Sequence, residues 1–409
     1  MLLKARKFFG HLISKAIFQS QAYNIERKQS IFKDSKNIQQ KYSSTADLNI
    51  NNFQVDSTGR AKIDLTEYSV RTDLNYNNSE SKIIINVYGR RDCYERHTEE
   101  LIKQAELYKE HNIKVVGLNF RNIMKSKGKV TSQQDWIDDI VAVVDYYAKE
   151  HNIKLSNILL SGHSMGAAFA TLAAAQIYQR EKEKTSVKLI NDRSFQNLPS
   201  IAVRLVFGNL GSGIFVGSIL AGLSLVTCVF FGFYGLLIAA AVFASCVLAS
   251  KIYPKIILKA CEIIANIILY PTFGLMNAAA AFKMLPVFSK EYVFVKDDPI
   301  IARESGLAYD PEIRKIRRKG KTSPSPDDLM FVRSSQHRFV ADETRPQSVQ
   351  DLTSQQDNLQ PDKKGLSKIK SRSTHDLPLF ALRTSCKKVS SISGADVYDG
   401  MVRRLLGLG

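Results

Sequence analysis

The sequence predicts an α/β fold with a doubly wound, mostly parallel sheet. Short apolar segments typical of buried strands alternate with segments of helical periodicity, and this alternation favours parallel strands joined by helices. One of these strands also runs into a glycine-flanked serine and then a run of small residues, which is typical of a tight strand-to-helix turn. The predicted strands cover residues 61–71, 82–88, 114–120, 157–161, 187–195 and 291–298, and the predicted helices cover 97–111 and 135–150.

The glycine-flanked serine is Ser164. Residues 157–166 read Asn-Ile-Leu-Leu-Ser-Gly-His-Ser-Met-Gly, and small side chains dominate residues 167–175. In a Gly-x-Ser-x-Gly turn the serine has a strained backbone, and neighbours without a Cβ avoid a clash beside it. A helix that begins at the serine directs its N–H groups and positive dipole end toward charge that develops during acyl transfer. We interpret this segment as a nucleophile elbow; the alternative is a glycine-rich turn with an incidental serine.

Composition narrows the possible partners. The 409 residues are 44% hydrophobic, which is enough for one large domain with additions or for two domains. The formal net charge is +18, with much of the excess near the N-terminus and after Arg303. Such a charge suits nucleic acid or an anionic membrane surface. No nucleic-acid-binding motif is found, so we expect a membrane and no nucleic acid. The five scattered cysteines predict reduced thiols and no metal site.

Residues 205–250 contain no charged side chain. This stretch is longer than one membrane span of about 20 residues and fits two spans joined by a turn. Basic residues flank it on both sides, which predicts a hairpin with both ends on the cytosolic face. The alternative is a very apolar lid over the candidate site. The next apolar segment, residues 263–282, is predicted to form interfacial or lid helices.

These features divide the chain into six parts. Residues 1–58 are predicted to be a basic amphipathic segment, lying on a membrane or packed on a partner, followed by a polar linker from residue 24. The core is predicted in 59–204, 291–310 and 374–409, and it is interrupted by an apolar helical insertion at 205–290 and a mobile basic and polar insertion at 311–373. A strand-like piece at 328–333 and a closing helix at 394–406 complete the prediction.

A nucleophilic serine requires a base and a group that orients the base. After an elbow of this kind, the acid precedes the histidine in the chain. Asp298 is the predicted acid because it ends a strand and precedes Pro-Ile-Ile, and Asp297 is the alternative. Only His337 and His375 lie downstream. We favour His375, between the mobile insertion and the closing helix, with His337 as the alternative. A solvated acidic turn and a chain without a working base also stay open.

Two backbone N–H groups are predicted to bind the oxyanion. The first belongs to Met165, which follows the serine. The second belongs to the loop after the strand at 82–88, where residues 89–95 read Gly-Arg-Arg-Asp-Cys-Tyr-Glu, and Arg90 is the expected donor. The alternative is a plain strand-to-helix turn. His163 is expected to support the elbow and not to act as the base, because its side chain is fixed beside the nucleophile.

Together these residues resemble the α/β-hydrolase superfamily. The resemblance runs from about residue 82 to residue 298 and resumes near residue 374. Asn-Phe-Arg-Asn at 119–122, Ser-Lys-Gly at 126–128 and Asn-Asp-Arg-Ser-Phe at 191–195 are similar to segments of uncharacterised hydrolase-like proteins of intracellular bacteria, some of them secreted effectors.

This chain departs from the usual pattern of those proteins at a few positions. The first segment there usually reads Asn-Tyr-Arg-Gly, whereas Asn122 occupies the last position here. The oxyanion loop there is usually Gly-Asn-Gly, and Arg90 and Arg91 replace its last two residues here. Ala167 stands where a second glycine is frequent. These departures concern the shape of the oxyanion loop and not the fold.

The resemblance implies a serine hydrolase of the esterase or lipase type that requires no metal or organic cofactor. The apolar insertion falls where the superfamily carries its lid, and a lid that enters the bilayer favours a lipid or other hydrophobic ester as substrate. We therefore expect a membrane-associated enzyme with its hydrolase domain on the cytosolic side, or a secreted effector that inserts in a host membrane.

Other functions stay open at this point. The main alternative is a catalytically inactive hydrolase-fold membrane protein that acts as a binding or effector module. A peptidase or thioesterase is also compatible with the fold. A transporter is disfavoured because the apolar stretch carries no intramembrane charge. The sequence predicts no particular protein partner.

Overall fold

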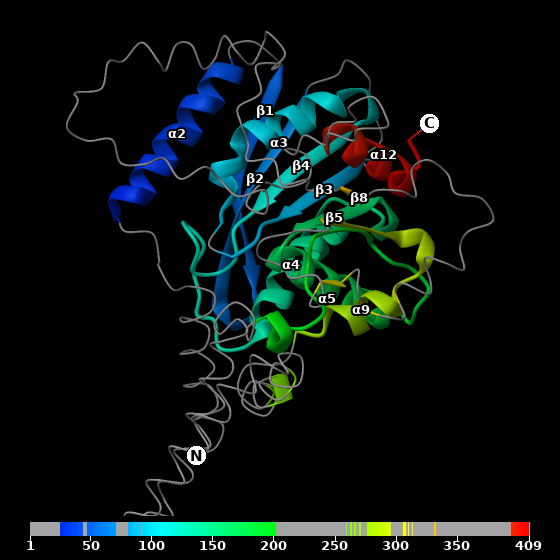
Figure 1. Cartoon of the computed structure of the whole chain (residues 1–409). Helices are drawn as coiled ribbons and strands as arrows, with labels where there is room; N and C mark the ends of the chain where they lie inside the picture. Colours follow the sequence, from blue (N-terminus) through cyan, green and yellow to red (C-terminus); the bar gives the residue numbers. More distant parts are fainter. Residues whose placement is uncertain are drawn as a thin grey trace, which may run out of the picture.

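The computed structural model describes residues 25–43, 47–70, 81–90, 92–201, 276–295 and 394–408, with isolated positions between 259 and 332. Strands in these parts of the chain form one sheet in the order β1-β2-β4-β3-β5-β6-β7-β8 (Figure 1). The pairs β1–β2 and β2–β4 are antiparallel, and the other neighbouring pairs are parallel. The predicted doubly wound, mostly parallel sheet is confirmed. The strands are β1 (Leu48–Ser57), β2 (Ala61–Val70), β3 (Lys82–Val87), β4 (Ile113–Leu118), β5 (Ile158–His163), β6 (Lys188–Asp192), β7 (Lys290–Val295) and β8 (Phe331–Val332).

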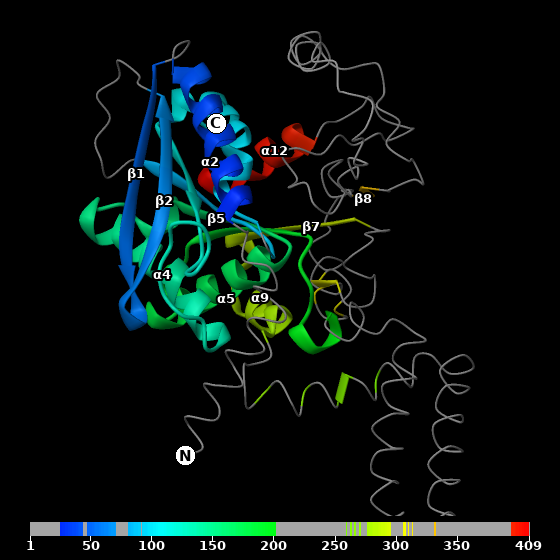
Figure 2. The ribbon, with the colours of Figure 1, turned by 90° about the vertical axis from the view of Figure 1, so that its left-hand side faces the viewer.

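Helices cover both faces of this sheet. Figure 2 shows α2, α3 and α12 on one face and α4, α5 and α9 on the other. Short 3-10 turns, among them η4 (Tyr94–His97), connect some of these elements. The helices are α2 (Ile25–Ser43), α3 (Thr98–Leu107), α4 (Gln133–Glu150), α5 (Met165–Arg180), α9 (Ala278–Met284) and α12 (Gly394–Leu406).

Alternating apolar residues supply the core on each face. In β3, Ile83 and Ile85 join the core under α4 and α5, whereas Ile84 joins the core under α3 and α12. Successive side chains of a strand point to opposite faces, so a continuous apolar run is required when both faces are covered. Trp136 of α4 meets Phe169 of α5 edge-on, with ring centroids 4.9 Å apart. The core therefore holds the nucleophile strand and its helix from both sides.

The polar segment predicted to be a linker instead contains α2 and β1. Their few apolar side chains explain this difference, because Ile38 of α2 and Ile50 of β1 pack against the core under α3. A buried hydrogen bond of 2.7 Å between the hydroxyls of Ser35 and Thr98 also fastens α2 to α3. β1 is an edge strand with many exposed positions, and polar residues are compatible with such a strand. The linker prediction for residues 25–57 was wrong.

The end of the predicted lid is also part of the core. α9 overlaps the end of the segment expected to form lid helices, but Ala278, Ala281 and Phe282 are buried against the core that α5 contributes to. Small side chains on both helices permit this close packing. The side chain of Asn277 accepts a hydrogen bond from the N–H of Ala280 and caps the start of α9.

Within the described residues, no helix is both long enough and apolar enough to cross a membrane. The hairpin predicted at 205–250 lies outside these residues, as does the basic segment at 1–23. Nearly all of the insertion predicted at 311–373 lies outside them too, apart from Ile313 and the two residues of β8.

Candidate active site

Ser164 is the single residue between β5 and α5. Its backbone has φ 54° and ψ −121°, a combination that residues with a Cβ rarely adopt. The N–H of Ser164 donates a hydrogen bond of 2.8 Å to the carbonyl oxygen of Asp192 at the end of β6. Strain of this kind persists only where the surroundings fix the backbone, and it is concentrated at functional sites. The strand, turn and helix predicted from the Gly-x-Ser-x-Gly pattern are thus observed.

The two glycines of this pattern lie where the backbone is crowded. A Cβ on Gly162 would lie 2.4 Å from the Cα of Ala167, and one on Gly166 would lie 2.3 Å from the carbonyl oxygen of Tyr88. Neither distance leaves room for a carbon atom. Gly166 therefore lets α5 start directly against the end of β3, which brings the loop after β3 close to Ser164.

The predicted oxyanion loop begins beside the nucleophile. A Cβ on Gly89 would lie 3.1 Å from the Cβ of Ser164 and 3.6 Å from its Oγ. The N–H of Asp92 donates to the carbonyl oxygen of Gly89 at 3.3 Å, which closes a tight turn over residues 89–92. Arg90 is exposed within this turn, and Met165 is the first residue of α5. The two predicted donors thus come from the two segments that meet at Ser164; their role stays a prediction.

A buried ion pair lies beneath the elbow. Arg193 donates from Nε to Oδ1 of Asp192 at 2.7 Å and from an Nη to Oδ2 at 2.9 Å. His163 Nδ1 lies 3.0 Å from Oδ2 of the same carboxylate. Burial by itself would raise the pKa of Asp192, but Arg193 and His163 hold it far below the usual range. His163 is therefore occupied by this pair, in keeping with a supporting role.

The rest of the segment at 191–195 fastens β6 to the nucleophile helix. Asn191 donates from Nδ2 to the carbonyl oxygen of Ala167 at 3.2 Å and to the hydroxyl of Thr171 at 2.8 Å. Arg193 has φ 56°, so the chain leaves the sheet here, and β6 is shorter than the strand predicted at 187–195. The sequence pattern indicated this segment but not the role of its Asp-Arg pair.

The loop after β3 is anchored to the end of β4. Tyr94 lies directly over Gly117, where a Cβ would be 2.5 Å from the Cβ of the tyrosine. Its N–H donates to Oδ1 of Asn119 at 3.1 Å, and its hydroxyl donates to Oδ2 of Asp64 at 2.7 Å. The asparagine that opens the segment at 119–122 thus positions the candidate oxyanion loop.

Glu95 is a buried carboxyl group in the same loop. Its two oxygens accept hydrogen bonds of 3.1 and 3.0 Å from Nδ2 of Asn119. Burial raises the pKa of Glu95 to about 7, although the bond from Asn119 acts in the opposite direction. A group of this kind titrates near neutrality, but it lies under the loop and not at the nucleophile.

His97 holds the other end of this loop. Its ring is stacked on Tyr88 with centroids 4.3 Å apart and an interplanar angle of 8°. Its Nε2 lies 2.7 Å from Oδ2 of Asp92, and its Nδ1 lies 2.9 Å from Oε2 of Glu100. Burial by itself would lower the pKa of His97, but Asp92 and Glu100 raise it to about 9. Sequence reasoning missed this cluster; its signal is an Asp, a His and a Glu spaced across the start of a helix.

Arg121 in the segment at 119–122 also has a structural role. Its Nε donates to the two carboxylate oxygens of Asp139 at 2.9 and 3.0 Å, and an Nη donates to Asp135 at 2.9 Å. A further bond of 3.2 Å reaches the hydroxyl of Ser57 at the end of β1. This buried guanidinium joins the loop after β4 to α4 and to the β1–β2 hairpin.

The predicted acid and base lie outside the described residues. This applies to Asp298 and Asp297 and to His375 and His337. In the part of the chain that the structure describes, no group of His, Cys, Asp and Glu side chains is arranged to hold a metal ion. The Cys93 thiol is buried, and burial raises its pKa well above the ordinary value.

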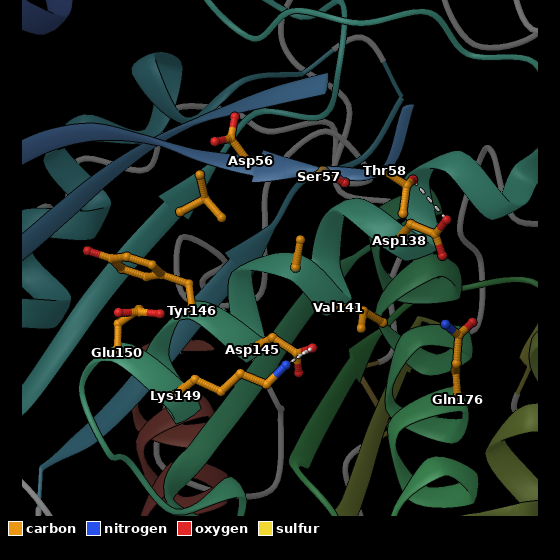
Figure 3. Close-up of a pocket in the computed structure, with 12 residues that line it drawn as sticks. Asp56, Ser57, Thr58, Asp138, Val141, Asp145, Tyr146, Lys149, Glu150 and Gln176 are labelled. Atoms are coloured by element: carbon orange, nitrogen blue, oxygen red, sulfur yellow. Dashed lines mark hydrogen bonds and ion pairs between the residues drawn. The ribbon is translucent and has the colours of Figure 1, made fainter. Parts of the chain in front are cut away.

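A surface groove of about 530 Å³ lies away from Ser164, between the end of β1 and α4 (Figure 3). Thr58 donates to Asp138 across it at 2.9 Å, and Tyr146 and Glu150 line its other end. The groove includes no residue of the elbow or of the turn at 89–92. It is therefore not the site in which Ser164 would meet a substrate.

Comparison with known proteins gives one family match. Residues 91–190 match the model of a family described as serine aminopeptidase, S33. No curated protein sequence matches the chain. The match to the family model begins in the turn before Asp92 and ends in β6, so it includes the elbow.

Several solved structures are similar to part of the chain. An esterase from Pyrococcus furiosus is 18% identical over 42% of this chain and 56% of its own, with a TM-score of 0.31. An alpha-beta hydrolase from Vibrio vulnificus is 15% identical over 77% and 81%, with a TM-score of 0.42. An esterase from Pyrobaculum calidifontis is 13% identical over 50% and 62%, with a TM-score of 0.32. The chain thus spans a little more than half the length of the Pyrococcus esterase.

The chain has the α/β-hydrolase fold. Its strand order, its parallel strands from β3 onward and a strained serine between β5 and α5 together define this fold. The serine lies at the carboxyl edge of the sheet, where ligands of open α/β sheets bind.

Proposed function

We propose that the chain is a serine hydrolase of the esterase type, with Ser164 as its nucleophile. The observation that carries this proposal is the strained backbone of Ser164, with φ 54° and ψ −121° between β5 and α5. A structural turn has no need of such strain at a serine, whereas a nucleophile gains exposure from it. The matching family model, named for a serine aminopeptidase, also supports a reactive serine and keeps peptide bonds as a second substrate class.

The proposed reaction follows the usual chemistry of an activated serine. Ser164 Oγ attacks the carbonyl carbon of the ester while His375 accepts the hydroxyl proton, and Asp298 orients the imidazole. The N–H groups of Met165 and Arg90 bind the oxyanion that forms. Collapse of this intermediate breaks the ester bond, and the departing alcohol takes the proton from His375. Water then hydrolyses the acyl-enzyme by the same steps and releases the acid. His337 and Asp297 are the alternative base and acid.

A fluorophosphonate probe tests this proposal directly, because it reacts preferentially with activated serines. We expect the full chain to be labelled and the Ser164→Ala variant to lose all labelling. Ser156→Ala is the matched control, since that serine is exposed just before β5, and it should be labelled like wild type. Wild-type protein that is folded but takes no label would overturn the proposal and favour the inactive binding module.

The same probe separates the candidate partners of the serine. Labelling should fall strongly in His375→Ala and remain in His337→Ala if His375 is the base. Asp298→Asn should reduce it more than Asp297→Asn. The reverse pattern in either pair would assign the role to the alternative residue.

We further propose that the substrate is a hydrophobic ester met at a membrane surface. The charge-free stretch at 205–250 supports this, since it is long enough for two spans or for an apolar lid. The full chain should float with anionic lipid vesicles in a density gradient, and deletion of residues 205–250 should abolish flotation. Deletion of residues 1–23 tests the basic segment separately. Full-length protein that stays at the bottom of the gradient would contradict this proposal.

A further inference from the structure

The turn at residues 89–92 has to keep a fixed position if it supplies an oxyanion donor. Its first residue, Gly89, lies beside Ser164, since a Cβ added to the glycine would be 3.1 Å from the Cβ of the serine. Its last residue, Asp92, closes the turn by a 3.3 Å bond from its N–H to the Gly89 carbonyl oxygen. A displacement of about 1 Å between reacting groups is enough to cost about 100-fold in rate. The side chains that hold the turn therefore bear on catalysis even though they do not touch a substrate.

His97 contacts the chain at both ends of this turn. Its ring is stacked on Tyr88, the residue before Gly89, and its Nε2 lies 2.7 Å from the carboxylate of Asp92. The opposite ring nitrogen lies 2.9 Å from Glu100, which belongs to the first turn of α3. The imidazole thus fixes the turn to a helix that packs in the core. His97 is only 2% exposed, so its position is itself determined by packing.

The contacts of His97 require its charged form. A neutral imidazole has one N–H and donates to one partner, whereas the imidazolium donates from both nitrogens. Both nitrogens of His97 face carboxylates, so the neutral ring loses one of its two bonds.

The other charged or titratable groups around His97 do not replace its proton. Arg96 donates to Asp92 at 3.0 Å, but to the oxygen that His97 does not use. Burial raises the pKa of Tyr88 well above its ordinary value, so the ring under the imidazole stays neutral, as do the phenols of Tyr68 and Tyr398 near it. Among the described residues, the charged groups in direct contact with His97 are thus Asp92 and Glu100, and Arg96 shares Asp92 with it.

We propose that His97 is a positioning residue for the reaction at Ser164: as an imidazolium it clamps the turn at 89–92 to α3, and loss of its proton releases the turn and slows the enzyme. This inference rests on the proposed function of Ser164. It adds a control of the site by alkaline pH that the elbow by itself does not have.

The direction of the pH effect follows from the raised pKa of His97. The pKa of His97 in the folded protein is about 9, above its ordinary value of 6.5. The stability that the charged ring contributes is therefore fully present below about pH 6.5, and the imidazolium, and with it the clamp, is lost as the pH rises through about 9. A catalytic histidine acts in the opposite sense, since it has to be neutral to accept a proton. An alkaline loss of rate thus separates the clamp from the base.

The test measures the rate of fluorophosphonate labelling of the full chain against pH. In wild type we expect this rate to fall as the pH rises through about 9, while the far-ultraviolet circular dichroism stays constant. In Glu100→Gln, one of the two carboxylates that favour the imidazolium is gone, so the fall should come at lower pH. Glu99→Gln is the matched control, because Glu99 is in the same first turn of α3 as Glu100 but pairs with Lys103. This variant should leave the pH profile unchanged.

The second part of the test measures the same labelling rate in a variant of His97 itself. His97→Gln should be labelled about 10-fold more slowly at neutral pH and should show no alkaline fall near pH 9. His151→Gln is its control, because His151 also packs on tyrosine rings but lies at the far end of α4. If His97→Gln does not fold, Glu100→Gln decides the matter.

The outcomes separate this inference from the proposed function. If wild type takes no label at any pH, the proposed function fails. If wild type is labelled but Glu100→Gln has the wild-type profile, the positioning role of His97 is wrong while Ser164 remains the nucleophile. An alkaline fall that coincides with unfolding by circular dichroism would also overturn the inference, because the clamp would then be a general stabilising contact.

Discussion

The elbow at Ser164 and the turn at residues 89–92 face each other, but different forces hold them. The backbone of the elbow is fixed by close contacts, since Gly162 and Gly166 leave no space for a Cβ, and the buried pair of Asp192 and Arg193 supports it from beneath. The turn is fixed by charged and polar side chains, with His97 and Asp92 at one end. Steric contacts do not depend on pH, whereas the charged contacts do. The two halves of the candidate site should therefore respond differently to substitution and to pH.

The largest expected effect comes from a substitution that disrupts the close backbone contacts of the elbow. Gly166→Ala would place a Cβ 2.3 Å from the carbonyl oxygen of Tyr88, so β3 and α5 would have to separate. We expect the free energy of unfolding to fall by about 4 kcal/mol, near the upper end for single substitutions. Urea unfolding followed by circular dichroism measures this change.

The control for this prediction is Gly400→Ala in α12. There the nearest atom to a new Cβ would be an Nη of Arg404 at 3.7 Å, so the alanine should fit and stabilise the helix by about 0.5–1 kcal/mol. Equal effects at the two positions would mean that close approach is not what requires glycine in the elbow.

The next effect concerns the charged support under the elbow. Arg193→Met removes the guanidinium that makes two bonds to Asp192, and the buried carboxylate loses its main opposite charge. We expect a loss of about 3 kcal/mol in unfolding free energy. Arg180→Met is the control, because its pair with Asp145 is more exposed and should contribute about 1 kcal/mol or less. Similar losses for the two variants would show that the buried pair contributes no more than a surface pair.

Local patterns were sufficient to predict most of the fold. Apolar runs predicted β3, β4 and β5, because buried parallel strands are apolar on both faces. The Gly-x-Ser-x-Gly spacing predicted the elbow, because its constraints arise within a few residues. The same reasoning failed for α2 and β1, where a few apolar side chains such as Ile38 are enough for packing when the rest of the element faces solvent.

Contacts between distant segments were beyond the same reasoning. Asn119 and Tyr94 are 25 residues apart, and their bond was found only from the structure. Asp192 and His163 meet because β5 and β6 are neighbours in register. Such pairs depend on strand order, which no local pattern records. The predicted acid and base, Asp298 and His375, depend on the same kind of long-range contact and stay predictions.

A smaller effect is expected at Glu95, a buried carboxyl group in the loop after β3. The pKa of Glu95 is about 7 in the folded protein, above its ordinary value of 4.5, so the wild type loses stability as the pH rises between these values. Glu95→Gln cannot titrate. Its unfolding free energy relative to wild type should therefore improve by about 2 kcal/mol between about pH 5 and pH 7.

Unfolding measured at several pH values tests how the unfolding free energy depends on pH. Glu150→Gln, at an exposed position, is the control. A difference between wild type and Glu95→Gln that does not change with pH would mean that the carboxyl is already ionised at low pH. The hydrogen bonds from Asn119 would then outweigh burial.

The smallest expected effect is at Gly89, where the turn at residues 89–92 lies beside the elbow. Gly89→Ala would place a Cβ 3.1 Å from the Cβ of Ser164, which is tight but can be relieved by a shift of a few tenths of an ångström. We expect little change in melting temperature, but fluorophosphonate labelling should slow by about 10-fold because the turn and the serine are displaced relative to each other. Gly400→Ala should be labelled at the wild-type rate. Wild-type labelling of Gly89→Ala would show that the turn yields easily, so that the contacts of His97 and Asp92 do not hold it as firmly as the backbone contacts hold the elbow.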